Sequence, residues 1–101
     1  MKELDIPAGA DGEDGAVEMI RFWLANGQDH VALNVGMFAK AEEPGCWGMI
    51  AADIVKHAIR VMLEKDPSRE RLTLIGEVTD AFHQRMAHNV KNDDTLSGRS
   101  Q

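Results

Sequence analysis

The sequence is poor in cysteine and in basic residues. Its one cysteine, Cys46, is unable to form an internal disulfide, so we expect a protein of the reducing cytoplasm. The 11 Lys and Arg stand against 17 Asp and Glu, a formal net charge of −6. Binding to nucleic acid or to an anionic bilayer needs a basic surface, so this charge argues against both partners.

Long apolar runs and phosphate-binding glycine motifs are also missing. No run approaches the roughly 18 apolar residues of a membrane span, and the acidic start lacks the pattern of a signal peptide. Neither G-x-G-x-x-G nor G-x-x-x-x-G-K-[ST] occurs, so we predict no nucleotide cofactor. What the chain does have is 44% hydrophobic and 28% charged residues over 101 positions. That balance is typical of one small globular domain.

Composition divides the chain into three parts. Residues 1–16 hold three glycines, one proline and five acids, which predicts a flexible segment, although residues 3–6 alternate and could add a short strand. Residues 90–101 are polar and predict a disordered tail. The remaining residues, 17–89, form the predicted domain. A core this small is marginal alone, which favours oligomerisation.

Asn26-Gly27 between two apolar runs predicts a β-hairpin over about 17–25 and 28–38, because a type I′ turn needs two positive φ angles. That turn pairs Leu24 with Asp29 and Glu18 with Val35. One face then holds Ile20, Phe22, Leu24, Val31, Leu33 and Val35, and the other holds Met19, Arg21, Trp23, Ala25, His30, Ala32 and Asn34. The alternative is a helix from about Asp14 to Asn26, but such a helix would have to be buried on nearly all sides.

Two helices follow the hairpin. Over about 47–64 the apolar residues recur on one side at a 3.6 period, namely Trp47, Ile50, Ala51, Ile54, Val55, Ala58, Ile59 and Met62. Asp66-Pro67 predicts the start of a second helix, over about 67–88. Its predicted buried residues are Leu72, Ile75, Val78, Thr79, Phe82 and Met86. The fold class is therefore α+β, a two-layer sandwich of helices on a hairpin, completed by a homodimer that joins two hairpins into one sheet.

The run from Trp47 to His57 after the Trp23…His30 hairpin resembles a family of small bacterial proteins, the domain of unknown function numbered 5076. The similarity covers about residues 17–65. It implies a bacterial, cytoplasmic protein with this order of elements. The family brings no activity, substrate or catalytic residue.

Three groups are weak candidates for chemistry. Cys46 precedes a helix, whose N-terminus stabilises a thiolate, but a lone cysteine there is usually a packing residue. Asp53 and His57 are four residues apart on a helix, so the carboxylate can bond the imidazole and orient it as a catalytic base. A solvated ion pair is the commoner outcome of this spacing. His83 and His88 point in different directions, and the acidic stretch 11–15 lacks the spacing of a calcium loop, so we predict no metal site.

The mixed face of the hairpin is the predicted interaction surface, with Trp23 opposite His30 and Met19 and Arg21 beside them. Another subunit, the N-terminal segment or the tail would commonly cover such a tryptophan. We therefore predict a non-enzymatic homodimeric interaction or regulatory module, with an unidentified protein as a further partner. The alternative is a small enzyme or ligand-binding protein that uses Asp53 and His57, with Cys46.

Overall fold

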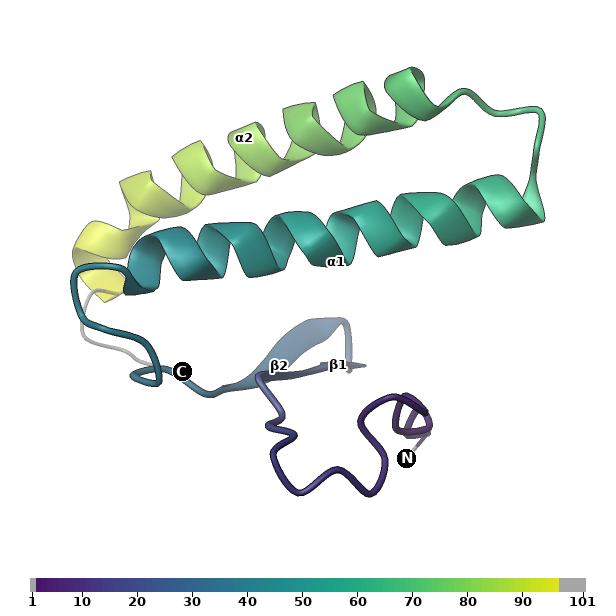
Figure 1. Ribbon diagram of the computed structural model, residues 1–101. Helices are drawn as coiled ribbons and strands as arrows, with labels where there is room; N and C mark the ends of the chain where they lie inside the picture. Colours follow the sequence, from purple (N-terminus) through teal and green to yellow (C-terminus); the bar gives the residue numbers. More distant parts are fainter. Residues whose placement is uncertain (1, 97–101) are drawn as a thin grey trace. The chain divides into compact units, whose positions relative to one another are not determined.

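The computed structural model describes residues 2–96, and side chains up to residue 88. Along the chain it has two strands, β1 (Ile20–Ala25) and β2 (Gln28–Leu33), then two helices, α1 (Glu43–Lys65) and α2 (Arg71–Leu96) (Figure 1). The chain divides into two compact units, one ending at Met37 and the other beginning at Phe38. The first unit holds the hairpin and the second holds both helices. The grouping of residues 17–89 into one domain stays a prediction.

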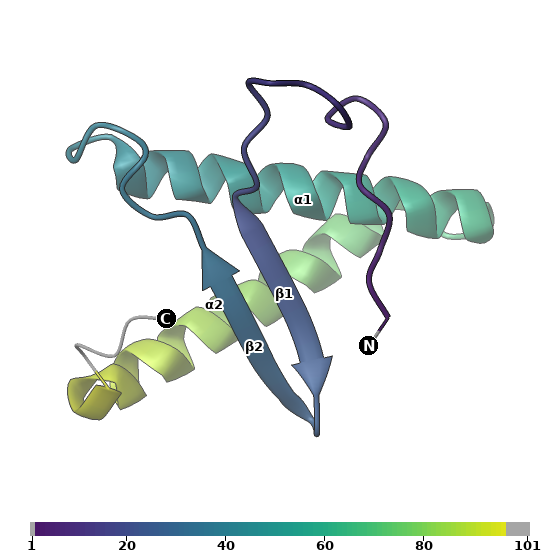
Figure 2. The same ribbon diagram turned by 90° about the horizontal axis from the view of Figure 1, so that it is seen from below.

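The two strands form the antiparallel hairpin that the sequence predicts (Figure 2). Leu24 pairs with Asp29, and the register runs without a break to Ile20 opposite Leu33. Asn26 and Gly27 have φ angles of 56° and 74°, as a type I′ turn requires. This turn fixes the register, and the alternative helix over residues 14–26 is wrong.

The strands are shorter than predicted at the end away from the turn. One backbone bond, from the Asn34 N–H to the Met19 carbonyl at 2.9 Å, continues the ladder past Ile20 and Leu33. Gly36 then takes a φ of 102°, which turns the chain away before a pair of Glu18 with Val35 can form. The predicted extension of the strands to residues 17 and 38 is therefore wrong.

The N-terminal segment forms turns, and residues 3–6 are not part of a strand. The Ala10 N–H bonds the Pro7 carbonyl at 2.9 Å, and the Ala16 N–H bonds the Glu13 carbonyl at 3.1 Å. These bonds are local. They satisfy some backbone groups without recruiting the segment into the sheet.

Helix α1 begins at Glu43, four residues before the predicted start. Pro44 is compatible with the first helical turn, where its missing N–H costs no hydrogen bond. The Ala39 carbonyl accepts the N–H groups of Glu42 and Glu43, both at 2.9 Å, which leads the chain into the helix. The Trp47 indole Nε1–H donates to Glu43 Oε2 at 3.0 Å. This i, i+4 contact stabilises the first turn.

The predicted two-sided character of α1 is largely confirmed. Ile59 is buried, with only 2% of its surface exposed. The half-buried apolar residues of the same side are Trp47, Ile50, Ala51, Val55 and Met62. Ile54 is half exposed and Ala58 is exposed. The polar residues of the opposite side all face solvent, namely Asp53, Lys56, His57, Arg60 and Glu64.

The junction between the helices differs from the prediction. Asp66 is the residue after α1, and its N–H bonds the Met62 carbonyl. Its carboxylate accepts the Ser68 hydroxyl at 2.6 Å and the Ser68 N–H at 3.2 Å. These two bonds hold the pKa of Asp66 below its ordinary value. The Arg69 N–H bonds the Asp66 carbonyl at 3.2 Å, so Pro67 lies in a single turn and does not open α2. The helix starts at Arg71, where the Leu74 N–H bonds the Glu70 carbonyl.

Helix α2 folds back along α1 (Figure 1), and its buried face was predicted wrongly. Leu74, absent from the predicted set, is 3% exposed. Of the predicted set only Val78 is half-buried, four residues along from Leu74. The others remain exposed, namely Leu72, Ile75, Thr79, Phe82 and Met86. The helix also continues to Leu96, past the predicted end near His88 and into the predicted tail, of which residues 97–101 lie outside the described part.

The predicted order of two strands and two helices, and the α+β class, are confirmed. The layering of helices on the hairpin and the homodimer stay predictions. Neither α1 nor the described part of α2 is long and apolar enough to cross a membrane.

Candidate functional site

The mixed face of the hairpin brings together the residues predicted to form the interaction surface. Trp23 on β1 pairs directly with His30 on β2. Trp23 is half-buried and His30 is exposed. Arg21 and Met19 precede Trp23 by two and four positions, which places them on the same face.

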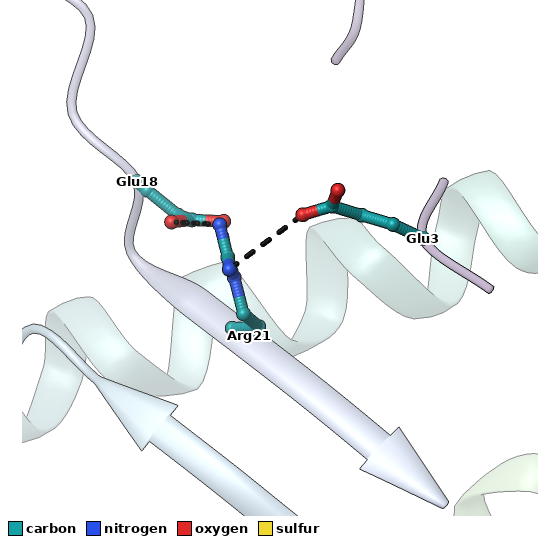
Figure 3. A network of polar contacts seen from close by, with 3 residues as sticks. All are labelled: Glu3, Glu18 and Arg21. Carbon is teal, nitrogen blue, oxygen red and sulfur yellow. Dashed lines mark hydrogen bonds and ion pairs between the residues drawn. The ribbon is translucent and has the colours of Figure 1, made fainter. Parts of the chain in front are cut away.

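Arg21 is already engaged by two carboxylates of its own unit (Figure 3). Its Nη2 lies 3.0 Å from Glu18 Oε1 and its Nε lies 3.2 Å from Glu18 Oε2, a two-pronged contact. Its Nη1 lies 3.6 Å from Glu3 Oε2. Glu3 belongs to the N-terminal segment, which runs beside β1 on the side away from β2 (Figure 2). The segment therefore reaches this part of the surface, and Arg21 is not a free cation.

A hollow of about 540 Å³ lies at the open end of the hairpin. It is lined by Glu18, Met19, Ile20, Arg21, Ala32, Leu33 and Asn34. Met19 and Arg21 of the predicted surface line this hollow, whereas Trp23 and His30 do not. The lining combines the Arg21–Glu18 ion pair with apolar side chains. Among these lining residues no nucleophile lies beside a base.

Both outer edges of the hairpin lack a further strand in residues 2–96. In an antiparallel pair the hydrogen-bonded and non-hydrogen-bonded positions alternate. The bond from Asn34 to Met19 sets the phase of that alternation, so the N–H and C=O groups of Asp29, Val31 and Leu33 point outward from β2. These groups form a ready template for another strand.

The predicted Asp53–His57 pair lies on the exposed side of α1, and no hydrogen bond joins the two side chains in the structure. Instead both line a hollow of about 270 Å³ together with Lys56, Arg60 and Arg71. The first four come from one face of α1, and Arg71 is the first residue of α2. Sequence spacing identified Asp53 and His57 but gave no sign that Arg71 would join them.

Cys46 lies in the first turn of α1, where its N–H bonds the Glu42 carbonyl at 3.1 Å. Its side chain is half-buried. Since the chain has one cysteine, any disulfide would need a second molecule. The structure places neither Asp53 nor His57 with it in a common hollow.

No group of three metal-binding side chains comes together in the part of the chain that the structure describes. His83 instead meets Phe82 edge to face, with ring centroids 6.3 Å apart. Such a contact is a packing arrangement.

Comparison with known proteins places this fold in a family. Residues 3–90 match the family model described as Domain of unknown function (DUF5076). The chain belongs to the DUF5076 family. The resemblance seen in residues 17–65 is thereby confirmed, and the match extends it to residues 3–16 and to most of α2.

The DUF5076 fold is also found in a solved structure. That protein, from the photosynthetic bacterium Rhodopseudomonas palustrus CGA009, is described as a "putative pyruvate dehydrogenase". It is 21% identical, with a TM-score of 0.66 over 85% of this chain and 83% of that one. At this identity the likeness shows the fold alone. No curated protein matches the chain.

Proposed function

We propose that this DUF5076 protein is a non-enzymatic, homodimeric interaction module of the bacterial cytoplasm. One observation carries the proposal: the hairpin is a two-stranded sheet that leaves large apolar side chains exposed. Phe22 and Leu24 expose 56% and 72% of their surface, and Leu33 exposes 40%. A two-stranded sheet alone is marginal in water. Pairing with the hairpin of a second copy would enlarge the sheet to four strands and thereby stabilise it.

The free edge of β2 supports a second copy as the occupant. An antiparallel pair of identical strands is related by a two-fold axis, the commonest symmetry of soluble oligomers. The edge of β1 is the poorer choice because the N-terminal segment runs beside it and Glu3 contacts Arg21. Pairing of β2 with the β2 strand of a second copy gives one four-stranded sheet. On one face of that sheet the residues Met19, Arg21, Trp23 and His30 of both copies form a continuous contact surface.

The solution mass tests this proposal. We expect light scattering at tens of micromolar to give twice the chain mass of 11.1 kDa. Trp23→Glu should lower the mass toward one chain, because it replaces a half-buried aromatic side chain opposite His30, a residue of the proposed pairing strand, with a carboxylate. Loss of such a cross-strand contact typically costs about 1 kcal/mol, a roughly five-fold weaker association if the whole loss falls on the dimer.

Leu4→Glu is the matched control, since Leu4 is 93% exposed in the N-terminal segment. This variant adds the same charge outside the proposed surface and should keep the wild-type mass. A wild-type mass of one chain that Trp23→Glu leaves unchanged would contradict the proposal.

A further inference from the structure

Three basic residues and one histidine gather around the smaller hollow, which belongs to the helical unit. Asp53, Lys56, His57 and Arg60 follow one another at i, i+3, i+4 and i+7 on α1 and therefore share a face. Arg71 reaches the same hollow of about 270 Å³ from the start of α2. The site is thus built from two helices rather than from one exposed helix face.

The charge of this hollow is unusual for an acidic chain. The whole sequence has 11 Lys and Arg and a net charge of −6, yet three of those basic residues line one hollow of five residues. Within the described residues no ion pair is recorded for Lys56 or Arg71. Arg60 has one weak pair, with its Nε 4.0 Å from Glu64 Oε2 and 59% of its side chain exposed. Asp53 is the single acid in the lining, so positive charge is in excess.

We infer that this hollow binds a phosphate group, either of free phosphate or of a phosphate monoester. Each guanidinium presents several N–H donors in a fixed plane that matches the oxygens of an oxyanion, and the lysine adds a point charge. A carboxylate carries one charge and two oxygens, which one arginine satisfies. A phosphate group carries up to two charges and three free oxygens, which use donors from both helices.

The position of Arg71 strengthens the site. As the first residue of α2 it lies at the positive end of a 26-residue helix. The helix dipole favours an anion near this end. Asp53 has the opposite effect: its carboxylate repels an anion in the hollow. Phosphate affinity should therefore increase when Asp53 is neutralised.

An NMR titration of the full chain with inorganic phosphate and with glycerol 3-phosphate tests the inference at constant ionic strength. We expect the amide signals of Lys56, His57, Arg60 and Arg71 to shift together. The double variant Arg60→Gln/Arg71→Gln should bind phosphate at least about ten-fold more weakly, because it loses the charged hydrogen bonds that the two guanidinium groups donate. Asp53→Asn should bind several-fold more tightly.

Lys65→Gln is the matched control for charge. Lys65 is the last residue of α1 and does not line the hollow. Its variant should bind as the wild type does. Absence of shifts at these residues would overturn the inference, as would equal weakening by Lys65→Gln and the double variant. Tighter binding of glycerol 3-phosphate would identify a monoester as the source of the phosphate group, and tighter or equal binding of inorganic phosphate would identify free phosphate. The mass in solution reports on the dimer separately, because none of these residues lies in the hairpin.

Discussion

Replacement of Ile59 by alanine should lower the free energy of unfolding by about 2–5 kcal/mol. Ile59 is 2% exposed, and with Leu74 it is one of two buried apolar side chains in the described residues. Solvent does not reach this buried side chain. Its truncation therefore leaves a cavity in addition to removing buried apolar surface. Small domains have about 5–15 kcal/mol of stability in total. Urea unfolding followed by circular dichroism measures the change.

Met49→Ala is the control for this substitution. Met49 lies on the same helix and exposes 63% of its surface, so its truncation should change the stability by no more than about 0.5 kcal/mol. If Ile59→Ala and Met49→Ala unfold at the same urea concentration, Ile59 is not the centre of the helical core.

If the proposed dimer forms through the edge of β2, proline at position 31 should convert it into a monomer. The Val31 N–H points outward from β2, away from β1. Proline has no N–H, so it removes a donor from the free edge while leaving the bonds between β1 and β2 in place. Val31 is the middle one of the three outward-pointing residues of β2. Removal of its N–H therefore interrupts the proposed pairing at the centre of the strand. Sedimentation equilibrium of Val31→Pro against the wild type measures the effect.

Val31→Ala provides the comparison, since it trims the same half-buried side chain but keeps the N–H. This variant should remain dimeric. The amide shifts of Asn26 and Gly27 report whether the hairpin is intact in each variant. A Val31→Pro protein that keeps the turn and also remains dimeric would exclude the β2 edge as the interface.

The hairpin was the most predictable part of the chain because its turn is local. Asn26 and Gly27 both adopt positive φ angles, which few other residue pairs accept, and a two-residue turn leaves one register. The ends of the strands were less predictable. They depend on Gly36, whose φ of 102° is a property that alternation of apolar residues does not reveal.

The helices show where local patterns mislead. Asp66-Pro67 has the composition of a helix start, and Asp66 accepts the Ser68 N–H as a capping residue would, but only one turn forms there and α2 begins at Arg71. On α2 the stripe from Leu72 to Met86 has helical spacing, yet Leu74 is the buried residue. Spacing defines a stripe of residues on a helix, whereas packing against α1 decides which stripe is buried. An exposed stripe of this kind remains available for contacts with other molecules.

The candidate sites divide in the same way. Trp23 opposite His30 follows from the register of the hairpin and was predicted from the turn alone. The basic hollow depends on Arg71 meeting Arg60 across two helices, and these residues are separated by the turn after α1. No spacing rule joins positions on different helices, so the sequence indicated Asp53 and His57 but not the cations that give the hollow its charge.

The most direct test of the homodimer is an isotope-filtered NMR experiment on a mixture of labelled and unlabelled chains. With Asp29, Val31 and Leu33 pointing outward, the antiparallel pairing of two β2 strands brings the Hα atoms of His30 and Ala32 of one copy opposite those of the other. We predict cross-peaks between labelled and unlabelled chains at these two residues. A sample at the same concentration that shows no such cross-peaks, together with a mass of one chain, would contradict the account.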